Sequence, residues 1–260
     1  MLVFPQLSTG ASALYPLTKL RMQRTVVNPL ADGRTDVFAD PDAAQAMWEM
    51  RASGLTRNEW DAIDNLFEQT AGGWKSFTFL DPTGNLLAWS EDFTGSAWAL
   101  DALMASTAGI ADPVGTTRAT RFTNSAQSTG SVTQTLAAPA DFQYCLSVWA
   151  RSGAGSPVSL RVGATTGTFA LGPAWKRLTM SAHSGAASDT VACAVEIDAG
   201  VVVDLFGMQL EAQLAASPYK QTGARGGVYS NARFASDELT VTAQSTDVFD
   251  ALIQIVSTEN

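Results

Sequence analysis

The residue types that most often carry out catalysis or hold a metal ion are scarce in this 260-residue sequence. It has one histidine, His183, and two cysteines, Cys145 and Cys193. These residues are too few for a zinc site made of histidines and cysteines, and they argue against most catalytic triads built on histidine. His183 lies in the loop-like segment 181–185 and has no sequence partner that would orient it as a base, so we expect a solvated loop histidine.

Carboxylates are more frequent, but their spacing does not indicate an acid/base pair. Asp81 and Asp112 each precede a proline, and Glu91 and Asp92 are adjacent. Glycoside hydrolysis needs two carboxyl groups held about 5 to 9 Å apart across a bond, and no such pair can be singled out. We expect turn caps and solvated acids at these positions. The sequence predicts no catalytic residue, no metal site and no cofactor. An enzyme acting on cell-wall polysaccharide is therefore the least favoured hypothesis, after a structural ring protein and a glycan-binding module.

One alternating segment offers a surface for sugars. Residues 144–151 alternate so that Trp149 and Arg151 lie on the face opposite Tyr144. If Tyr144 faces the core, Trp149 and Arg151 are on the outer face, where Arg161 of the next strand can join them. Sugar rings stack on exposed aromatic faces, so Trp149, Arg151 and Arg161 are the predicted glycan-binding residues. The alternative is that Trp149 packs against a neighbouring strand or another domain.

Charge and cysteine usage exclude several classes of partner and compartment. The chain has 16 Lys and Arg against 25 Asp and Glu, a net charge of −9, with no long basic run. Nucleic acid and anionic membranes require a basic surface, so neither is an expected partner. The N-terminus lacks the pattern of a signal peptide and no apolar stretch exceeds strand length, so we expect a soluble chain made in the cytosol. Cys145 and Cys193 lie in strand-like runs and should be small buried side chains without a disulfide.

Only the first part of the chain contains a convincing helix. Thr56 and Glu59 form a capping-box pattern, apolar residues follow at helical spacing, and Ala71-Gly72-Gly73 provides a stop. This pattern predicts a helix over about 57–70 with Trp60, Ile63 and Phe67 on one face. The expected strands around it cover residues 20–27, 47–52 and 74–80.

The middle of the chain is rich in Ser, Thr, Ala and Gly and carries short alternating runs separated by turn signals. The runs cover residues 130–136, 144–150, 158–162, 175–180, 190–197 and 201–210. Regularly spaced short strands of this kind are typical of an antiparallel jelly-roll β-sandwich.

The last part of the chain contains three more predicted strands, over residues 226–234, 238–242 and 248–256. Three strands are too few for an independent domain. We therefore expect residues 1–82 and 219–260 to form one discontinuous parent domain, with residues 83–218 inserted into it. The predicted fold class is mainly β, with a β-sandwich-type parent domain that contains one α-helix and an inserted jelly roll.

The two terminal segments carry short motifs that are moderately specific as an ordered pair. They are Phe4-Pro5, Ala31–Arg34, Trp48–Met50, Leu55–Glu59 and Gly73–Pro82 at the start, and Ala232–Val241 and Asp250–Val256 at the end. Together they resemble the distal tail proteins of long-tailed phages and gene transfer agents. The resemblance implies a structural protein at the virion tail tip. The resemblance also implies that this protein forms a homo-oligomeric ring, commonly a hexamer, which joins the tail tube to the hub or baseplate.

The middle segment opens with Asn85-Leu86-Leu87 and closes with Gly207-x-Gln-Leu-Glu211. With Trp98 and Trp175, which we expect in the core, these motifs are similar to carbohydrate-binding-module-like jelly rolls of phage tail and fibre proteins. The motifs mark a fold more than a ligand. The resemblance implies an outward-facing insert that either binds host-cell glycan or serves as a spacer. The alternative to the ring is a glycan-binding adsorption protein that resembles a tail fibre.

Overall fold

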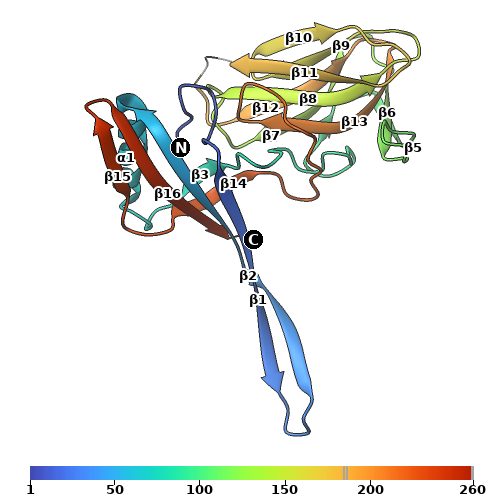
Figure 1. Ribbon diagram of the computed structural model, residues 1–260. Coiled ribbons are helices and arrows are strands. Elements are labelled where there is room, and N and C mark those ends of the chain that lie inside the picture. Colours follow the sequence, from blue (N-terminus) through green and yellow to red (C-terminus); the bar gives the residue numbers. More distant parts are fainter. Residues whose placement is uncertain (184, 186, 259–260) are drawn as a thin grey trace. The chain divides into compact units, whose positions relative to one another are not determined.

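The computed structural model describes residues 1–183, 185 and 187–258 (Figure 1). The chain divides into two compact units: unit 1 comprises residues 1–7, 13–79 and 229 onward, and unit 2 comprises residues 8–12 and 80–228. The sequence instead predicts an insert over 83–218 and assigns residues 8–12 to the parent domain. Ser184, in the loop expected around His183, and the last two residues lie outside the described part of the chain.

Unit 1 is built on one antiparallel sheet in which the N-terminal and C-terminal segments pair directly. The strand order is β1-β2-β16-β14-β3, and β15 also pairs with β16. The strands are β1 (Leu17–Pro29), β2 (Thr35–Thr56), β3 (Phe77–Leu80), β14 (Val228–Phe234), β15 (Thr240–Ser245) and β16 (Val248–Thr258). The central pairing of β2 with β16 joins segments that are about 200 positions apart.

The helix α1 (Arg57–Thr70) begins and ends where the sequence predicts. The Thr56 N–H donates to Glu59 Oε2 at 2.8 Å and the Glu59 N–H donates to Thr56 Oγ1 at 3.4 Å, which confirms the capping box. Ala71 ends the helix in the left-handed conformation at φ 51°. Trp60 and Ile63 are buried, whereas Phe67 is half-buried against Phe234 of β14.

The hairpin between β1 and β2 is much longer than the sequence predicts. Beyond a register shift at Met22 and Arg24, residues 24–40 form a two-stranded ribbon, which we call the arm. Figure 1 shows it extending away from the rest of the unit 1 sheet. Asp40-Pro41 is a strand-breaking signal, but it lies where the ladder is already interrupted, and irregularities of this kind tolerate proline.

Unit 2 is an antiparallel β-sandwich of the jelly-roll type, with two five-stranded sheets. The back sheet has the order β10-β9-β12-β7-β4, and the front sheet has the order β11-β8-β13-β6-β5. Back-sheet strands are β4 (Ala99–Leu100), β7 (Gly130–Leu136), β9 (Val158–Val162), β10 (Thr165–Phe169) and β12 (Val191–Ile197). Front-sheet strands are β5 (Met104–Ile110), β6 (Ala119–Asn124), β8 (Gln143–Arg151), β11 (Lys176–His183) and β13 (Val202–Glu211).

The mainly β fold class is confirmed, and each of the six runs predicted in the middle of the chain is a strand. The sequence misses β4, β5, β6 and β10. The edge strands β5 and β10 expose most of their Ser, Thr, Ala and Gly side chains, so they lack the apolar alternation that reveals a strand. Among the described residues, α1 is the one α-helix, and no helix is long and apolar enough to cross a membrane.

Candidate functional site

Strand β8 positions two of the three predicted site residues as expected. Tyr144, Leu146 and Val148 belong to the core cluster of unit 2, so the strand alternation places Trp149 and Arg151 on the outer face of the front sheet.

Arg161 does not join them, and the expectation that it does is wrong. Its strand, β9, pairs with β10 and β12 in the back sheet, because the chain crosses between the sheets after β8. Arg161 forms an ion pair with Glu196 of β12, with Nε and Oε1 2.6 Å apart. Consecutive strands of a sandwich often lie in different sheets, and the sequence contains no local signal for this crossing.

Trp149 lies at the centre of an aromatic cluster. It is half-buried, and the Arg177 guanidinium of β11 lies 4.7 Å from its ring centroid. Phe206 and Tyr219 pack against the ring at centroid distances of 6.0 and 5.5 Å. Gly207 (φ +61°) permits this approach, because a Cβ there would lie 3.1 Å from Tyr219 Cζ. Trp149 therefore packs against neighbouring strands, which is the alternative to an open sugar-binding surface, because its ring is already in contact with other side chains.

A second group of side chains lies on the same face of the front sheet, two residues along β8 and β13 from the pair of Trp149 and Phe206. We call Trp175, Arg151, Asp204 and Arg121 the arginine row. Asp204 Oδ1 accepts from Arg121 Nε at 2.7 Å, and its Oδ2 accepts from Arg151 Nε at 2.9 Å. The Arg151 guanidinium also lies 4.6 Å from the Trp175 ring centroid. Trp175 is half-buried just before β11, which corrects the expectation of a core position.

The arginine row combines fixed hydrogen-bond donors with an aromatic ring. Burial disfavours the ionised form of Asp204, but hydrogen bonds and attraction from Arg121 and Arg151 outweigh it and lower the pKa of this carboxyl. Two guanidinium groups, with five N–H donors each, share this one carboxylate. Because the Arg121 side chain is 47% exposed and Asp204 only 6%, the accessible charge of the row is positive.

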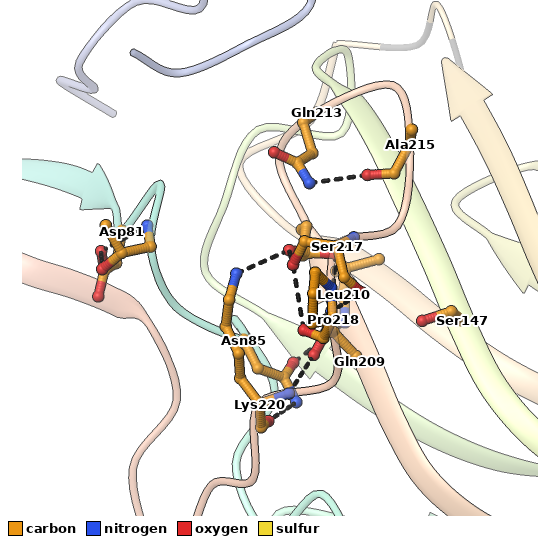
Figure 2. Close-up of polar contacts among 12 residues, drawn as sticks. Asp81, Asn85, Ser147, Gln209, Leu210, Gln213, Ala215, Ser217, Pro218 and Lys220 are labelled. Atoms are coloured by element: carbon orange, nitrogen blue, oxygen red, sulfur yellow. Dashed lines mark hydrogen bonds and ion pairs between the residues drawn. The ribbon is translucent and has the colours of Figure 1, made fainter. Parts of the chain in front are cut away.

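The two motifs that open and close the insert bind each other and support this face (Figure 2). Asn85 Nδ2 donates to the Met208 carbonyl at 2.9 Å, and Gln209 Oε1 accepts from the Lys220 N–H at 2.7 Å. The buried Glu211 carboxylate accepts from the Ser217 N–H at 2.9 Å and from Lys220 Nζ at 3.0 Å. These contacts fix the segment that carries Tyr219 onto Trp149, so the motifs mark structure, as the sequence predicts.

The remaining candidate residues occupy mostly structural positions. Asp81 and Asp112 accept from backbone N–H groups two residues ahead, which confirms them as turn caps. Glu91 is not a solvated acid: its side chain is 8% exposed and pairs with Arg118. His183 is exposed at the end of β11 rather than in a loop. Within the described residues, no three His, Cys, Asp or Glu side chains are grouped to hold a metal ion.

The candidate site residues that the sequence misses are Arg121, Asp204 and Arg177. Each occupies an outward position of its strand, but only the pairing of the strands places it on the same sheet face as Trp149 and Arg151. Asp204 is opposite Arg121 on one side and Arg151 on the other, and Arg177 is opposite Trp149. Trp98, in contrast, is buried as expected.

No protein-family model matches this chain, and no curated protein has a significantly similar sequence. Solved structures are similar over about half of the chain. The family 22 carbohydrate binding module of Clostridium thermocellum Xyn10B has a TM-score of 0.40 and 14% identity over 52% of this chain and 99% of its own.

Two further structures show the same level of similarity. The module TmCBM61, solved with beta-1,4-galactotriose, has a TM-score of 0.36 and 17% identity over 48% of this chain and 97% of its own. The enzymatically active domain of bacteriophage CBA120 tailspike protein 4 has a TM-score of 0.36 and 15% identity over 51% of this chain and 22% of its own. At such scores, function has to be inferred from this chain's own residues.

Proposed function

We propose that this chain is a structural protein of a phage-type tail tip whose unit 2 binds glycan on the host surface through the arginine row. The observation that carries the glycan-binding role is the side-by-side placement of Trp175, Arg151, Asp204 and Arg121 on one sheet face. One face of Trp175 is covered by the Arg151 guanidinium, so a sugar ring would stack on the other face while its oxygens accept from the guanidinium N–H groups. Because Asp204 already holds both guanidinium groups in place, binding would require little further ordering of these side chains.

A glycan array probed with the full chain tests this role. Arg121→Ala should weaken binding to the recognised glycan by roughly tenfold or more, since a hydrogen bond from a charged group contributes about 1.5–3 kcal/mol. Trp175→Ala should also weaken binding, because it removes the ring on which the sugar stacks. Arg161→Ala is the matched control, because it removes an arginine with a carboxylate partner from the back sheet. Absence of glycan binding by the wild-type chain would leave a spacer role, and equal losses in all three variants would argue against the arginine row.

We also propose a second role, in which unit 1 assembles copies of this chain into a ring, the hexamer that the terminal motifs imply. The arm supports this role. Val27 is opposite Val37 and Val26 is opposite Phe38, so apolar side chains occupy both faces of a two-stranded ribbon. Val27, Val37 and Phe38 are 56%, 63% and 54% exposed. A two-stranded ribbon with exposed apolar side chains gains stability when it packs against a partner surface.

The mass of the full chain in solution tests the ring. Replacing Val37 and Phe38 together with serine should shift the assembly toward monomer without changing the thermal unfolding of unit 2. Ser substitutions at Thr25 and Asn28, which are also exposed on the arm, serve as the control. A wild-type chain that stays monomeric at high concentration and is absent from purified particles would contradict the ring, its tail-tube and hub partners and its place at the tail tip.

A further inference from the structure

The strand pairing places the charges of the arginine row side by side across the front sheet. Asp204 of β13 is opposite Arg151 of β8 and opposite Arg121 of β6. Arg121 is in turn opposite Thr107, an exposed residue of the edge strand β5. Directly opposite residues of antiparallel strands lie on one face, so two guanidinium groups flank a single carboxylate. The row therefore carries one more positive charge than negative charge.

Each arginine of the row retains N–H donors that no protein group uses. Asp204 accepts from Nε and Nη2 of Arg121, at 2.7 and 3.1 Å, and from Nε of Arg151 at 2.9 Å. Arg151 Nη2 donates to the Ala111 carbonyl at 3.4 Å. The Nη1 groups of Arg121 and Arg151 have no hydrogen-bond partner among the described residues.

Both of these Nη1 groups are accessible. The side chains of Arg121 and Arg151 are 47% and 26% exposed. Across the described part of the chain, the one buried guanidinium nitrogen without a partner is Arg177 Nε, so the unpaired Nη1 of the half-buried Arg151 reaches solvent. A ligand can thus accept from both arginines of the row without displacing Asp204.

A further positive charge lies on the same face. Arg177 is opposite Trp149, and its guanidinium lies 4.7 Å from the Trp149 ring centroid. Its Nη2 donates to Ser147 Oγ at 2.9 Å and to the Ser217 carbonyl at 2.8 Å, and no carboxylate of the described residues forms an ion pair with it. Arg177 therefore adds to the excess positive charge of the row.

The carboxylates that pair with the front-sheet arginines are buried. They are Asp204, Asp112 and Glu91. Asp112 and Glu91 both face Arg118, which is balanced by them and is not part of the excess. Both oxygens of Asp204 already accept from arginine. An anion that approaches the row from solvent therefore meets guanidinium groups before it meets a carboxylate.

We propose that the arginine row binds an acidic sugar unit, one that carries a single negative charge on a carboxylate or a sulfate ester. The anionic oxygens accept from Nη1 of Arg121 and Nη1 of Arg151. The inference rests on the glycan-binding function proposed above and deepens it by naming the class of ligand. A charged acceptor forms shorter and stronger hydrogen bonds with a guanidinium than a sugar hydroxyl does. One anionic group also balances the positive charge that Asp204 leaves, whereas a neutral sugar leaves it unbalanced.

A glycan array of matched pairs, probed with the full chain, tests the proposal. One set pairs oligosaccharides that contain uronic or sialic acids with their carboxyl-reduced counterparts, which differ in the charged group alone. A second set pairs sulfated oligosaccharides with their desulfated counterparts. At least one acidic member should bind roughly tenfold or more tightly than its neutral counterpart, a difference of about 1.4 kcal/mol. The set that shows the preference identifies the carboxylate or the sulfate as the bound group.

Arg121→Gln tests whether the row produces the preference. Glutamine retains N–H donors but removes the charge, so binding of the acidic member should weaken roughly tenfold while binding of the neutral member changes little. Arg161→Gln is the matched control, because Arg161 also pairs with a carboxylate but lies on the back sheet.

A second variant leaves the contacts of the row in place. Thr107→Glu adds a negative charge opposite Arg121, so it should also weaken binding of the acidic member roughly tenfold. Thr166→Glu is its matched control, because Thr166 is exposed on the edge strand β10 and opposite Arg161. Thermal melts of all four variants separate a loss of binding from a loss of the fold.

Salt provides an independent readout, because the Debye length falls from about 30 Å at about 0.01 M salt to about 3 Å at about 1 M. Binding of the acidic member should weaken over this range more than binding of its neutral counterpart. Equal binding of acidic and neutral members, or a preference that both Arg121→Gln and Thr107→Glu leave unchanged, would overturn the proposal. If neutral glycans bind equally well and their binding depends on Trp175, the glycan-binding function stands and the acidic class fails. If no glycan binds at all, both fail.

Discussion

Asn85 Oδ1 accepts a hydrogen bond at 3.0 Å from the backbone N–H of Leu210, which lies 125 positions later in the chain. The Leu86 N–H also donates to the Leu210 carbonyl at 2.8 Å. The segment at Asn85 and the strand β13 are therefore joined directly. The Asn85 side chain contributes to this connection with both its oxygen, which accepts from Leu210, and its nitrogen, which donates to the Met208 carbonyl. This relationship makes Asn85 a sensitive position for the stability of unit 2.

Asn85→Ala should lower the free energy of unfolding of unit 2 by about 3 kcal/mol. The side chain is 1% exposed and bonds to four backbone groups, so its removal leaves buried groups without partners. Chemical denaturation measures the change, with Asn28→Ala, an exposed position on the arm, as the control. A change below about 1 kcal/mol would mean that water replaces the side chain at no great loss.

Asp112→Asn should destabilise the chain in a pH-dependent way. Burial disfavours the charged form, but hydrogen bonds from Thr116, Arg118 and Val114 outweigh it and lower the pKa of Asp112 from 3.8 to about 2. A carboxyl whose pKa falls on folding stabilises the fold above its unfolded value, and this contribution disappears as the pH drops through the folded value.

The difference in stability between the wild type and Asp112→Asn should therefore have its full size above about pH 4 and decrease between about pH 4 and pH 2. Thermal melts of both proteins across this range measure it. Thr116→Val, which removes the donor to the same carboxylate, should give a smaller loss with the same pH dependence. A difference that is constant from pH 7 to pH 2 would contradict the assignment.

The two cysteines should not react with thiol reagents while the chain is folded. Burial raises the pKa of the Cys145 thiol to about 11 and that of Cys193 to about 12, so the reactive thiolate is rare at pH 8. Both thiols are free and buried. A colorimetric thiol assay should detect no rapid reaction in buffer and two thiols in denaturant; fast labelling of either in buffer would show that its strand opens readily.

Thr56→Ala should destabilise unit 1 by about 1 kcal/mol, the usual effect of losing an N-cap. The hydroxyl accepts from the Glu59 N–H, one of the donors that a helix leaves unpaired at its start. Thr56→Ser retains the acceptor and should restore most of the stability. Denaturation monitored by circular dichroism distinguishes the two variants, and equal behaviour would indicate that tertiary packing alone fixes the start of α1.

Local signals explain what could be predicted from the sequence. The capping box and the stop at Ala71 act within a few residues, so the bounds of α1 are readable from the chain. Alternation of apolar residues correctly identifies which side chains of β8 enter the core. The motifs at Asn85 and Gly207 likewise lie close to the entry of the chain into unit 2 and in the last strand of unit 2, β13.

Non-local geometry explains what could not be predicted. Arg161 follows Arg151 closely in sequence, but the chain changes sheets between them. Glu91 looks like half of a solvated acidic pair, because the arginine that buries it lies 27 positions away. The arginine row depends on register between strands that no single segment specifies, and the length of the arm is obscured by a proline at an interruption of the ladder.

The Asp81 N–H donates to the Gly227 carbonyl at 2.8 Å, so the chain enters and leaves unit 2 at neighbouring points. An insert with adjacent ends can be exchanged as a cassette, because any domain of similar span between its termini fits the same junction. Recombination at this junction would replace unit 2, and with it any ligand that unit 2 binds, while leaving the sheet of unit 1 intact. The same junction is the place to graft a foreign binding domain in the laboratory.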